Sequence, residues 1–113
     1  MIKIYHNNRC SKSRSGLKIL ENSGKDFEVI KYLENPVNFD ELKSIIDKLG
    51  IKPEALLRKN EAVWKDNFKG KTLTDLQIIK VMVENPKLIE RPIVVNGQKA
   101  VLGRPAEKIG EIL

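Results

Sequence analysis

The first third of the chain alternates between strand-like and helix-like hydrophobic patterns. Residues 1–5 alternate apolar and polar side chains, and residues 27–32 are rich in β-branched and aromatic side chains, so both segments predict strands. Between them, apolar residues at helical spacing predict a helix over about residues 11–22, ended by Ser23-Gly24. A strand, a helix and a strand in this order predict a βαβ unit with parallel strands and a right-handed crossover.

Helical spacing dominates the middle of the chain. Asn38, with Glu41 three residues later, is a helix-start signal, and Gly50 is a stop signal. The segment between these signals carries an apolar stripe typical of a buried helix face, formed by Phe39, Leu42, Ile45, Ile46 and Leu49.

Two further helices are expected before the last quarter of the chain. Pro53 suits the first turn of a short helix that continues to Leu57. Thr74 with Gln77 marks the start of another helix, which Pro86 stops. The apolar stripes of these segments indicate core packing rather than a cofactor site. In the second helix, the residues expected on the buried face are Leu76, Ile79 and Val83.

The last quarter returns to strand patterning. Two apolar runs, residues 93–95 and 99–102, flank Asn96-Gly97, and this arrangement predicts a hairpin with a type I′ turn. Pro105 then predicts the start of a final helix. The inner side of that helix is expected to carry Ile109, Ile112 and Leu113.

The order of these elements predicts an α/β fold of the thioredoxin-like kind. A β-α-β unit, several helices and a β-β-α unit make a four-stranded mixed sheet with a helical insertion at about residues 37–90. With 113 residues there is room for one core, so residues 1–113 are expected to form a single domain.

Composition narrows the possible functions. A hydrophobic content of 41% and a charged content of 32% are those of an ordinary folded protein. No apolar run approaches the roughly 18 residues of a membrane span, so no membrane partner is expected. The net charge of +6 is spread along the chain without a nucleic-acid motif, which favours anionic partners other than nucleic acid. The single cysteine cannot form an internal disulfide, which indicates a cytoplasmic protein.

That cysteine, Cys10, lies where the first predicted strand leads into the first predicted helix. Unpaired N–H groups and the dipole at a helix start favour an anion, and therefore thiolate over thiol. Arg9, Lys12 and Arg14 add positive charge nearby. The pattern predicts a nucleophilic cysteine. The alternative is a buried structural cysteine, which seldom has so many polar neighbours.

Two arginines bracket the predicted hairpin. Arg91 precedes Pro92, a candidate for a cis peptide bond, and Arg104 follows the last strand. Because a hairpin returns the chain to its starting edge, both arginines are expected at one edge of the sheet, beside Cys10. Guanidinium groups bind oxyanions through paired hydrogen bonds, so this edge predicts an oxyanion pocket. Taken singly, each arginine has the alternative of being a solvent-exposed side chain.

Five segments, taken in order, carry a resemblance to a known family. They are residues 6–14 (HNNRCSKSR), 32–36 (YLENP), 55–60 (ALLRKN), 91–95 (RPIVV) and 104–107 (RPAE). Together they resemble the glutaredoxin-coupled arsenate reductase family (ArsC-like), which is related to Spx-type regulators. The resemblance implies a thioredoxin-like fold with a helical insertion. It also implies that Cys10 attacks arsenate, or a similar oxyanion, and that three arginines bind it: Arg58, Arg91 and Arg104.

The implied chemistry depends on external thiols. Reduction of arsenate needs two electrons, and one cysteine provides one sulfur, so glutathione and then glutaredoxin are the expected partners. Glutathione would act as a co-substrate, with no bound cofactor and no metal. His6 is a candidate for holding the thiolate or passing a proton, against the alternative of a surface imidazole. Ser13 and the N–H groups after Cys10 are candidates for binding the oxyanion.

Some residues depart from the family pattern. Asn8 stands where a proline is usual, and Ser11-Lys12 stands where Gly-Thr is usual. Two other functions therefore stay open: a non-enzymatic Spx-like regulator that binds RNA polymerase, and a thiol protein of this fold without arsenate activity. Regulators that sense through a disulfide use a CxxC pair, and this chain has Ser13 at the second position.

Overall fold

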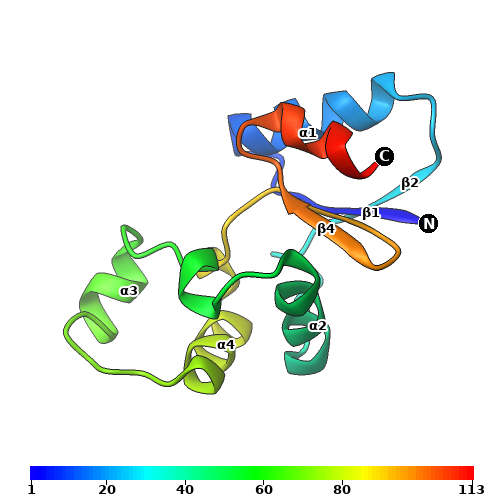
Figure 1. Ribbon diagram of the computed structural model, residues 1–113. Coiled ribbons are helices and arrows are strands. Elements are labelled where there is room, and N and C mark those ends of the chain that lie inside the picture. The colour runs from blue at the N-terminus through cyan, green and yellow to red at the C-terminus, as the bar shows by residue number, and fades with distance from the viewer. The chain divides into compact units, whose positions relative to one another are not determined.

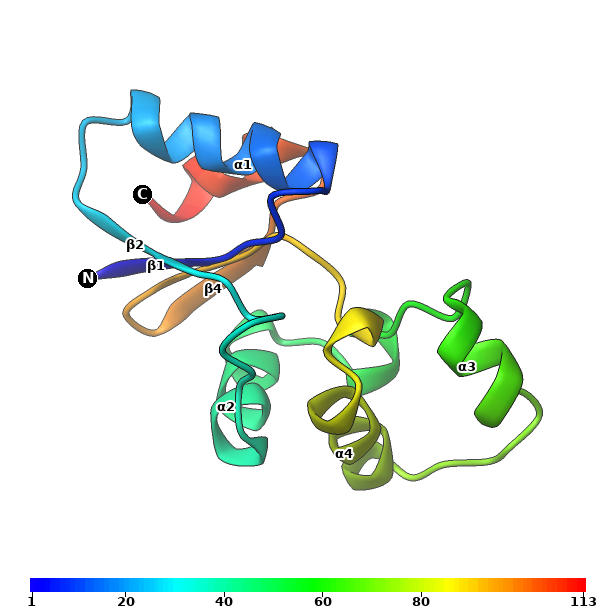
Figure 2. The ribbon, with the colours of Figure 1, turned by 180° about the vertical axis from the view of Figure 1, so that it is seen from behind.

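A computed structural model describes residues 1–113 (Figures 1 and 2). Chain contacts divide the protein into two compact units, Met1–Asn35 with Arg91–Leu113, and Pro36–Glu90. The second unit has nearly the bounds expected for the helical insertion, and the single-domain organisation stays a prediction. None of the helices is both long enough and apolar enough to cross a membrane.

A four-stranded mixed sheet forms the centre of the first unit. Its order is β2-β1-β3-β4, with β1 parallel to β2, and β3 antiparallel to both β1 and β4. This sheet confirms the predicted fold class, although β2 ends two residues earlier than predicted. The strands are β1 (Ile2–Tyr5), β2 (Phe27–Ile30), β3 (Ile93–Asn96) and β4 (Lys99–Leu102).

Two helices cover one face of this sheet and lie side by side (Figure 2). They are α1, Ser11–Asn22, as predicted, and the C-terminal 3₁₀ helix η3, Ala106–Ile112. In the strand register Ile4 lies opposite Val94, and both side chains are fully buried. The apolar core on this side is completed by Ile2, Leu20 and Ile109.

The hairpin between β3 and β4 differs from the predicted one. Asn96 pairs with Lys99, so the loop residues are Gly97 and Gln98 rather than Asn96 and Gly97. Only Gly97 has a positive φ, 62°, which is the pattern of a type II′ turn, whereas type I′ needs positive φ at both loop positions. Asn96 instead stays in β3, and its side-chain amide donates to the carbonyl of Ile112 at 2.6 Å. This contact with η3 is not visible in the local sequence.

The second unit consists of helices, and the starts predicted at Asn38 and Thr74 are confirmed. Asn38 Oδ1 accepts the N–H of Glu41 at 2.8 Å, and Thr74 and Gln77 form a reciprocal capping box. Gly50, with a φ of 67°, ends the first of these helices. The elements are α2 (Phe39–Leu49), η1 (Pro53–Leu56), α3 (Ala62–Asn67), α4 (Asp75–Glu84) and η2 (Pro86–Leu88).

The short helix α3 was not predicted from the sequence. Glu61, at its N-cap position, makes no side-chain capping hydrogen bond. The helix carries Trp64, which is buried and stacks on Phe68 with ring centroids 5.5 Å apart. Packing of the aromatic rings, rather than a capping signal, therefore marks this helix.

The buried face of α4 is also not the predicted one. Leu76 is 58% exposed and Val83 is only partly buried, whereas Ile79 is buried as expected. The buried stripe centres on Ile78 and Met82, one turn apart, and at about 100° per residue Leu76 lies on the opposite side. Apolar residues occur nearly all round this helix, so spacing alone did not decide which side faces the core.

Gly16 lies where α1 approaches the start of β3. A β-carbon at this position would lie 2.9 Å from Cγ of Pro92 and 3.0 Å from Cδ1 of Ile109. We expect Gly16→Ala to lower the free energy of unfolding by about 1–3 kcal/mol, because overpacking outweighs the gain in helix propensity. Denaturant unfolding measures this. Gly110→Ala, with nothing within 4 Å of the added carbon, is the control; equal stability of both variants would contradict the close packing at Gly16.

Candidate functional site

The loop that carries Cys10 is held by its own backbone and side chains. The N–H of Cys10 donates to the carbonyl of Asn7 at 3.0 Å, and the N–H of Arg9 donates to Oδ1 of Asn7 at 3.0 Å. Arg14, from α1, donates from Nη1 to the carbonyl of Asn8 at 2.8 Å. These bonds place Cys10 at the N-cap position of α1 with extended backbone. Its sulfur therefore lies at the end of the helix where N–H groups are unpaired.

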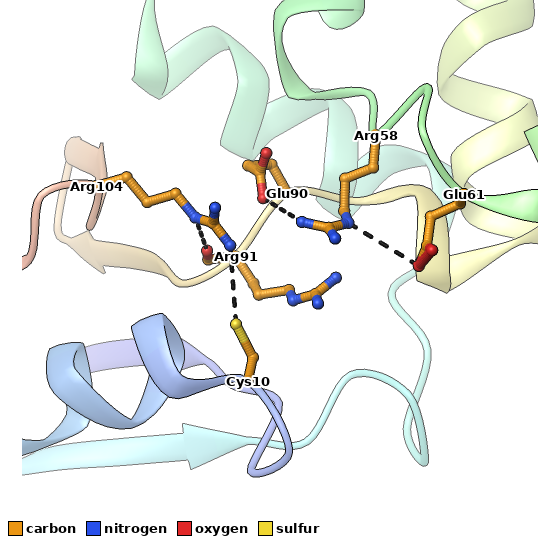
Figure 3. A network of polar contacts seen from close by, with 6 residues as sticks. All are labelled: Cys10, Arg58, Glu61, Glu90, Arg91 and Arg104. Carbon is orange, nitrogen blue, oxygen red and sulfur yellow. Dashed lines mark hydrogen bonds and ion pairs between the residues drawn. The ribbon is translucent and has the colours of Figure 1, made fainter.

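Two arginines, Arg91 before β3 and Arg104 after β4, lie near this cysteine, and Arg104 contacts its sulfur (Figure 3). Arg104 donates from Nη2 to Sγ of Cys10 over 3.7 Å, and from Nε to the carbonyl of Arg91 at 2.7 Å. The side chain of Arg91 also acts on Cys10, because its positive charge lowers the pKa of the thiol. Both arginines are half-buried, and Cys10 is 9% exposed with the Arg104 guanidinium against its sulfur. The structure thus brings together three residues that are far apart in the sequence.

Each arginine of this pair precedes a proline in a cis peptide bond. Arg91–Pro92 is cis, the conformation for which Pro92 was the candidate, and Arg104–Pro105 is cis as well. The second cis bond was not predicted, because the local sequence offered no reason to single it out from other X–Pro bonds.

The pKa of the Cys10 thiol is lowered from its ordinary value. Burial raises the pKa, since it disfavours the charged thiolate. The side chain of Arg91 and the backbone N–H groups of Ser13 and Lys12 act in the opposite direction and outweigh burial. Guanidinium charge and helix-start N–H groups therefore both stabilise the thiolate.

We expect Cys10 to titrate below the ordinary cysteine pKa of about 8.5. The pH dependence of its alkylation by iodoacetamide measures this, and the same cysteine in urea-unfolded protein provides the reference. Because the folded state favours the thiolate, the group stabilises the fold above its unfolded pKa. That stabilisation is lost as the pH falls through the lowered, folded-state pKa. A folded-state pKa at or above the unfolded one would contradict the electrostatic account.

His6 and Ser13 form a buried polar pair between the Cys10 loop and α1. Nδ1 of His6 lies 2.6 Å from Oγ of Ser13, which also accepts the N–H of Asn7 at 3.1 Å. His6 is 4% exposed, so the alternative of a surface imidazole is wrong. Burial lowers the pKa of His6, and the charges of Lys31 and Arg14 lower it further, so the imidazole is neutral at pH 7.

These contacts determine which groups of Ser13 and His6 can act on the sulfur of Cys10. Ser13 is fully buried with its hydroxyl engaged by His6 and the loop backbone, so its backbone N–H, not its hydroxyl, is the group that acts on Cys10. The side chain of His6 bonds to Ser13 and so supports the loop. The catalytic role of His6 and the substrate-binding role of Ser13 stay predictions.

Arg58, the third arginine that the resemblance implied, belongs to the second unit. Its Nη1 donates to Oε1 of Glu90 at 2.8 Å, and its Nε lies 4.0 Å from Oε1 of Glu61 (Figure 3). Its backbone N–H donates to the carbonyl of Leu88 at 2.8 Å. Within its own unit Arg58 is therefore held by two carboxylates, and its part in an oxyanion pocket stays a prediction.

A cavity of about 490 Å³ opens in the first unit between the start of α1 and the segment that joins β4 to η3. Sequence spacing did not indicate it, because only the tertiary fold brings η3 against α1. No group of three or more His, Cys, Asp or Glu side chains is arranged to hold a metal ion. The cavity is lined by Lys12, Ser15, Gly103, Arg104, Pro105, Ala106 and Glu107.

The chain is similar to several known proteins over nearly its whole length. The model of the ArsC family matches residues 5–112. The arsenate reductase of Neisseria meningitidis serogroup B is 40% identical, over 99% of this chain and 97% of that protein. "Uncharacterized protein YfgD" of Escherichia coli strain K12 is 44% identical, over 99% and 96%. The solved structure of an arsenate reductase from Vibrio cholerae has a TM-score of 0.93 and 46% identity, and covers 99% of this chain and 97% of its own.

Proposed function

This chain belongs to the ArsC family, and we propose that it reduces arsenate with Cys10 as the nucleophile and with glutathione and glutaredoxin as reductants. Its relatives named arsenate reductase make it an oxidoreductase. The observation that carries the proposal is the cluster of one thiol and two guanidinium groups, with Nη2 of Arg104 at 3.7 Å from Sγ of Cys10. A thiolate among cations attacks an anionic electrophile more easily, because the cations offset the repulsion between them.

The first step joins sulfur to arsenic. In neutral forms, the Cys10 thiol and H₃AsO₄ give an S–AsO₃H₂ adduct and water. The S–As bond forms as an As–O bond breaks, and the thiol proton leaves with the water. Arg91 and Arg104 bind the arsenate oxygens and stabilise the charge that develops on them. Arg58 is the third arginine that we assign to the anion.

The second step moves two electrons. The sulfur of a second thiol bonds to the sulfur of Cys10 as the bond between Cys10 sulfur and arsenic breaks. The electron pair of that bond stays on arsenic, which takes up the thiol proton and leaves as arsenite. Two sulfurs are oxidised to one disulfide while As(V) becomes As(III). The chain has a single cysteine, so the second thiol comes from glutathione, and glutaredoxin reduces the resulting disulfide. We place this reaction in the cytoplasm, where thiols are kept reduced.

The remaining candidate residues act on Cys10 through the loop. The N–H groups of Ser13 and Lys12 lower the pKa of the Cys10 thiol and, with the helix dipole, favour an oxyanion beside it. His6 is assigned as a positioning residue, because its bond to the Ser13 hydroxyl ties the loop to α1. A neutral imidazole in that place adds no charge of its own to the sulfur.

The test is arsenate-dependent oxidation of NADPH in the presence of glutathione, glutathione reductase and glutaredoxin. We expect turnover that stops when glutathione or glutaredoxin is omitted. Phosphate in place of arsenate is the control and gives no oxidation, because thiols do not reduce it. No arsenate-dependent turnover with the complete set would overturn the proposal.

A negative result in that assay separates the two alternatives. Capture of RNA polymerase subunits by the tagged protein would then indicate an Spx-like regulator. A mass increase of one glutathione on the protein, unaffected by arsenate, would instead indicate a thiol protein without arsenate activity.

A further inference from the structure

The cavity between α1 and the β4–η3 segment lies beside the reactive sulfur. Arg104 lines the cavity, and the same side chain donates from Nη2 to Sγ of Cys10 at 3.7 Å. Lys12, which also lines the cavity, follows Cys10 by two residues at the start of α1. Cys10 does not itself line the cavity, but a molecule held there and the sulfur at which the second thiol must react share Arg104 as a neighbour.

The charges of the lining match one class of thiol. Lys12 and Arg104 contribute two positive charges and Glu107 one negative charge, so the lining carries a net charge of +1. The side chains of Lys12 and Glu107 are exposed, and neither forms an ion pair or a side-chain hydrogen bond with another residue. Glutathione carries two carboxylates and one ammonium at neutral pH. Its charges are the complement of those on the cavity wall.

We propose that this cavity is the glutathione subsite, in which Lys12 pairs with a carboxylate of the tripeptide and Glu107 with its ammonium. The inference rests on the proposed function, which needs an external thiol at Cys10. A volume of about 490 Å³ lies within the range of roughly 300–1,000 Å³ in which small organic ligands bind. A neutral thiol of similar reactivity gains nothing from these two side chains, so the subsite selects for a charged tripeptide.

Binding is tested with S-methylglutathione, whose blocked sulfur cannot react. We expect its titration to shift the amide resonances of Ser15, Gly103 and Ala106. Lys12→Gln and Glu107→Gln should each raise its Kd by about three- to tenfold, the range for a charged hydrogen bond that is partly exposed. Lys18→Gln and Glu111→Gln, on the same two helices but outside the cavity lining, are the matched controls and should leave the Kd unchanged.

An analogue without the amino group tests which charge meets Glu107. S-methylated glutaryl-cysteinylglycine lacks the ammonium and should bind wild type and Glu107→Gln equally, while its Kd still rises in Lys12→Gln. If Glu107→Gln weakens both ligands to the same extent, the assignment of the ammonium to Glu107 is overturned.

Kinetics separate this inference from the proposed function. In the coupled assay, Glu107→Gln should raise the KM for glutathione by about three- to tenfold and leave the KM for arsenate unchanged. Arsenate turnover with a KM for glutathione insensitive to Lys12 and Glu107 would overturn the subsite and leave the reductase intact. Binding of S-methylglutathione at these residues without any arsenate turnover would support the subsite and overturn the reductase.

Discussion

Replacing Cys10 with serine is expected to abolish arsenate-dependent oxidation of NADPH, lowering kcat by at least about a thousandfold. A serine hydroxyl is not ionised near pH 7, and the surroundings that stabilise a thiolate do not make it a comparable nucleophile. No second cysteine in the chain can take over. The measurement is the coupled assay with glutathione, glutathione reductase and glutaredoxin. The rate of NADPH oxidation without the protein sets the detection limit of this assay.

The loss of activity in Cys10→Ser must be distinguished from a loss of folded structure. Serine has the same shape as cysteine with a smaller terminal atom, and the loop around Cys10 is held by backbone bonds that serine keeps, so the thermal midpoint should move by no more than a few degrees. Wild type incubated with oxidised glutathione should gain one glutathione by mass, and Cys10→Ser none. Arsenate turnover by a folded Cys10→Ser variant would remove the cysteine from the mechanism.

Replacing Arg91 with alanine is expected to have the second-largest effect. Its side chain is the principal group that lowers the pKa of Cys10, and we assign it to the arsenate oxygens as well. The thiol pKa should therefore rise, and kcat/KM for arsenate should fall by about 10²–10³, the usual result of losing one preorganised donor to a developing oxyanion. The alkylation profile measures the first effect and the coupled assay the second.

Two further variants locate the cause of that effect. Arg91→Lys keeps the charge without the paired donors, so it should restore much of the thiol pKa shift but little of the arsenate reaction. Arg9→Ala removes an arginine that is adjacent to Cys10 in the sequence, but whose exposed guanidinium forms no hydrogen bond or ion pair in the structure. It should leave the thiol pKa nearly unchanged. A rise as large as that in Arg91→Ala would mean that the general positive field, and not the Arg91 contact, sets the pKa.

Local pattern predicted the framework around Cys10 and the starts of two helices in the second unit. The strand before it, the helix over residues 11–22 and the caps at Asn38 and Thr74 depend on neighbours within a few residues, which a short window contains. The convergence of Arg91 and Arg104 was also predicted, because a tight hairpin returns the chain to the edge at which it started.

Local pattern gave wrong predictions where the structure depends on residues that are far away in the sequence. The turn after β3 falls on Gly97-Gln98 because Asn96 pairs with Lys99 and bonds to Ile112. Leu76 was assigned to the wrong side of α4, since which side faces the core depends on what packs there. The burial of His6 against Ser13 was missed for the same reason.

The sequence alone determined the four strands, most of the helices and their order, and that one cysteine is the only possible thiol, because these properties are settled by neighbouring side chains and by counting. Only the tertiary structure decided that Arg9 is not among the groups that lower the pKa of Cys10, that the Ser13 hydroxyl faces His6, and that η3 lies against α1 beside a charged, open cavity. Charge and hydrogen bonding act through space over a few ångströms, and residues far apart in the sequence meet within that range only after the sheet and helices have packed.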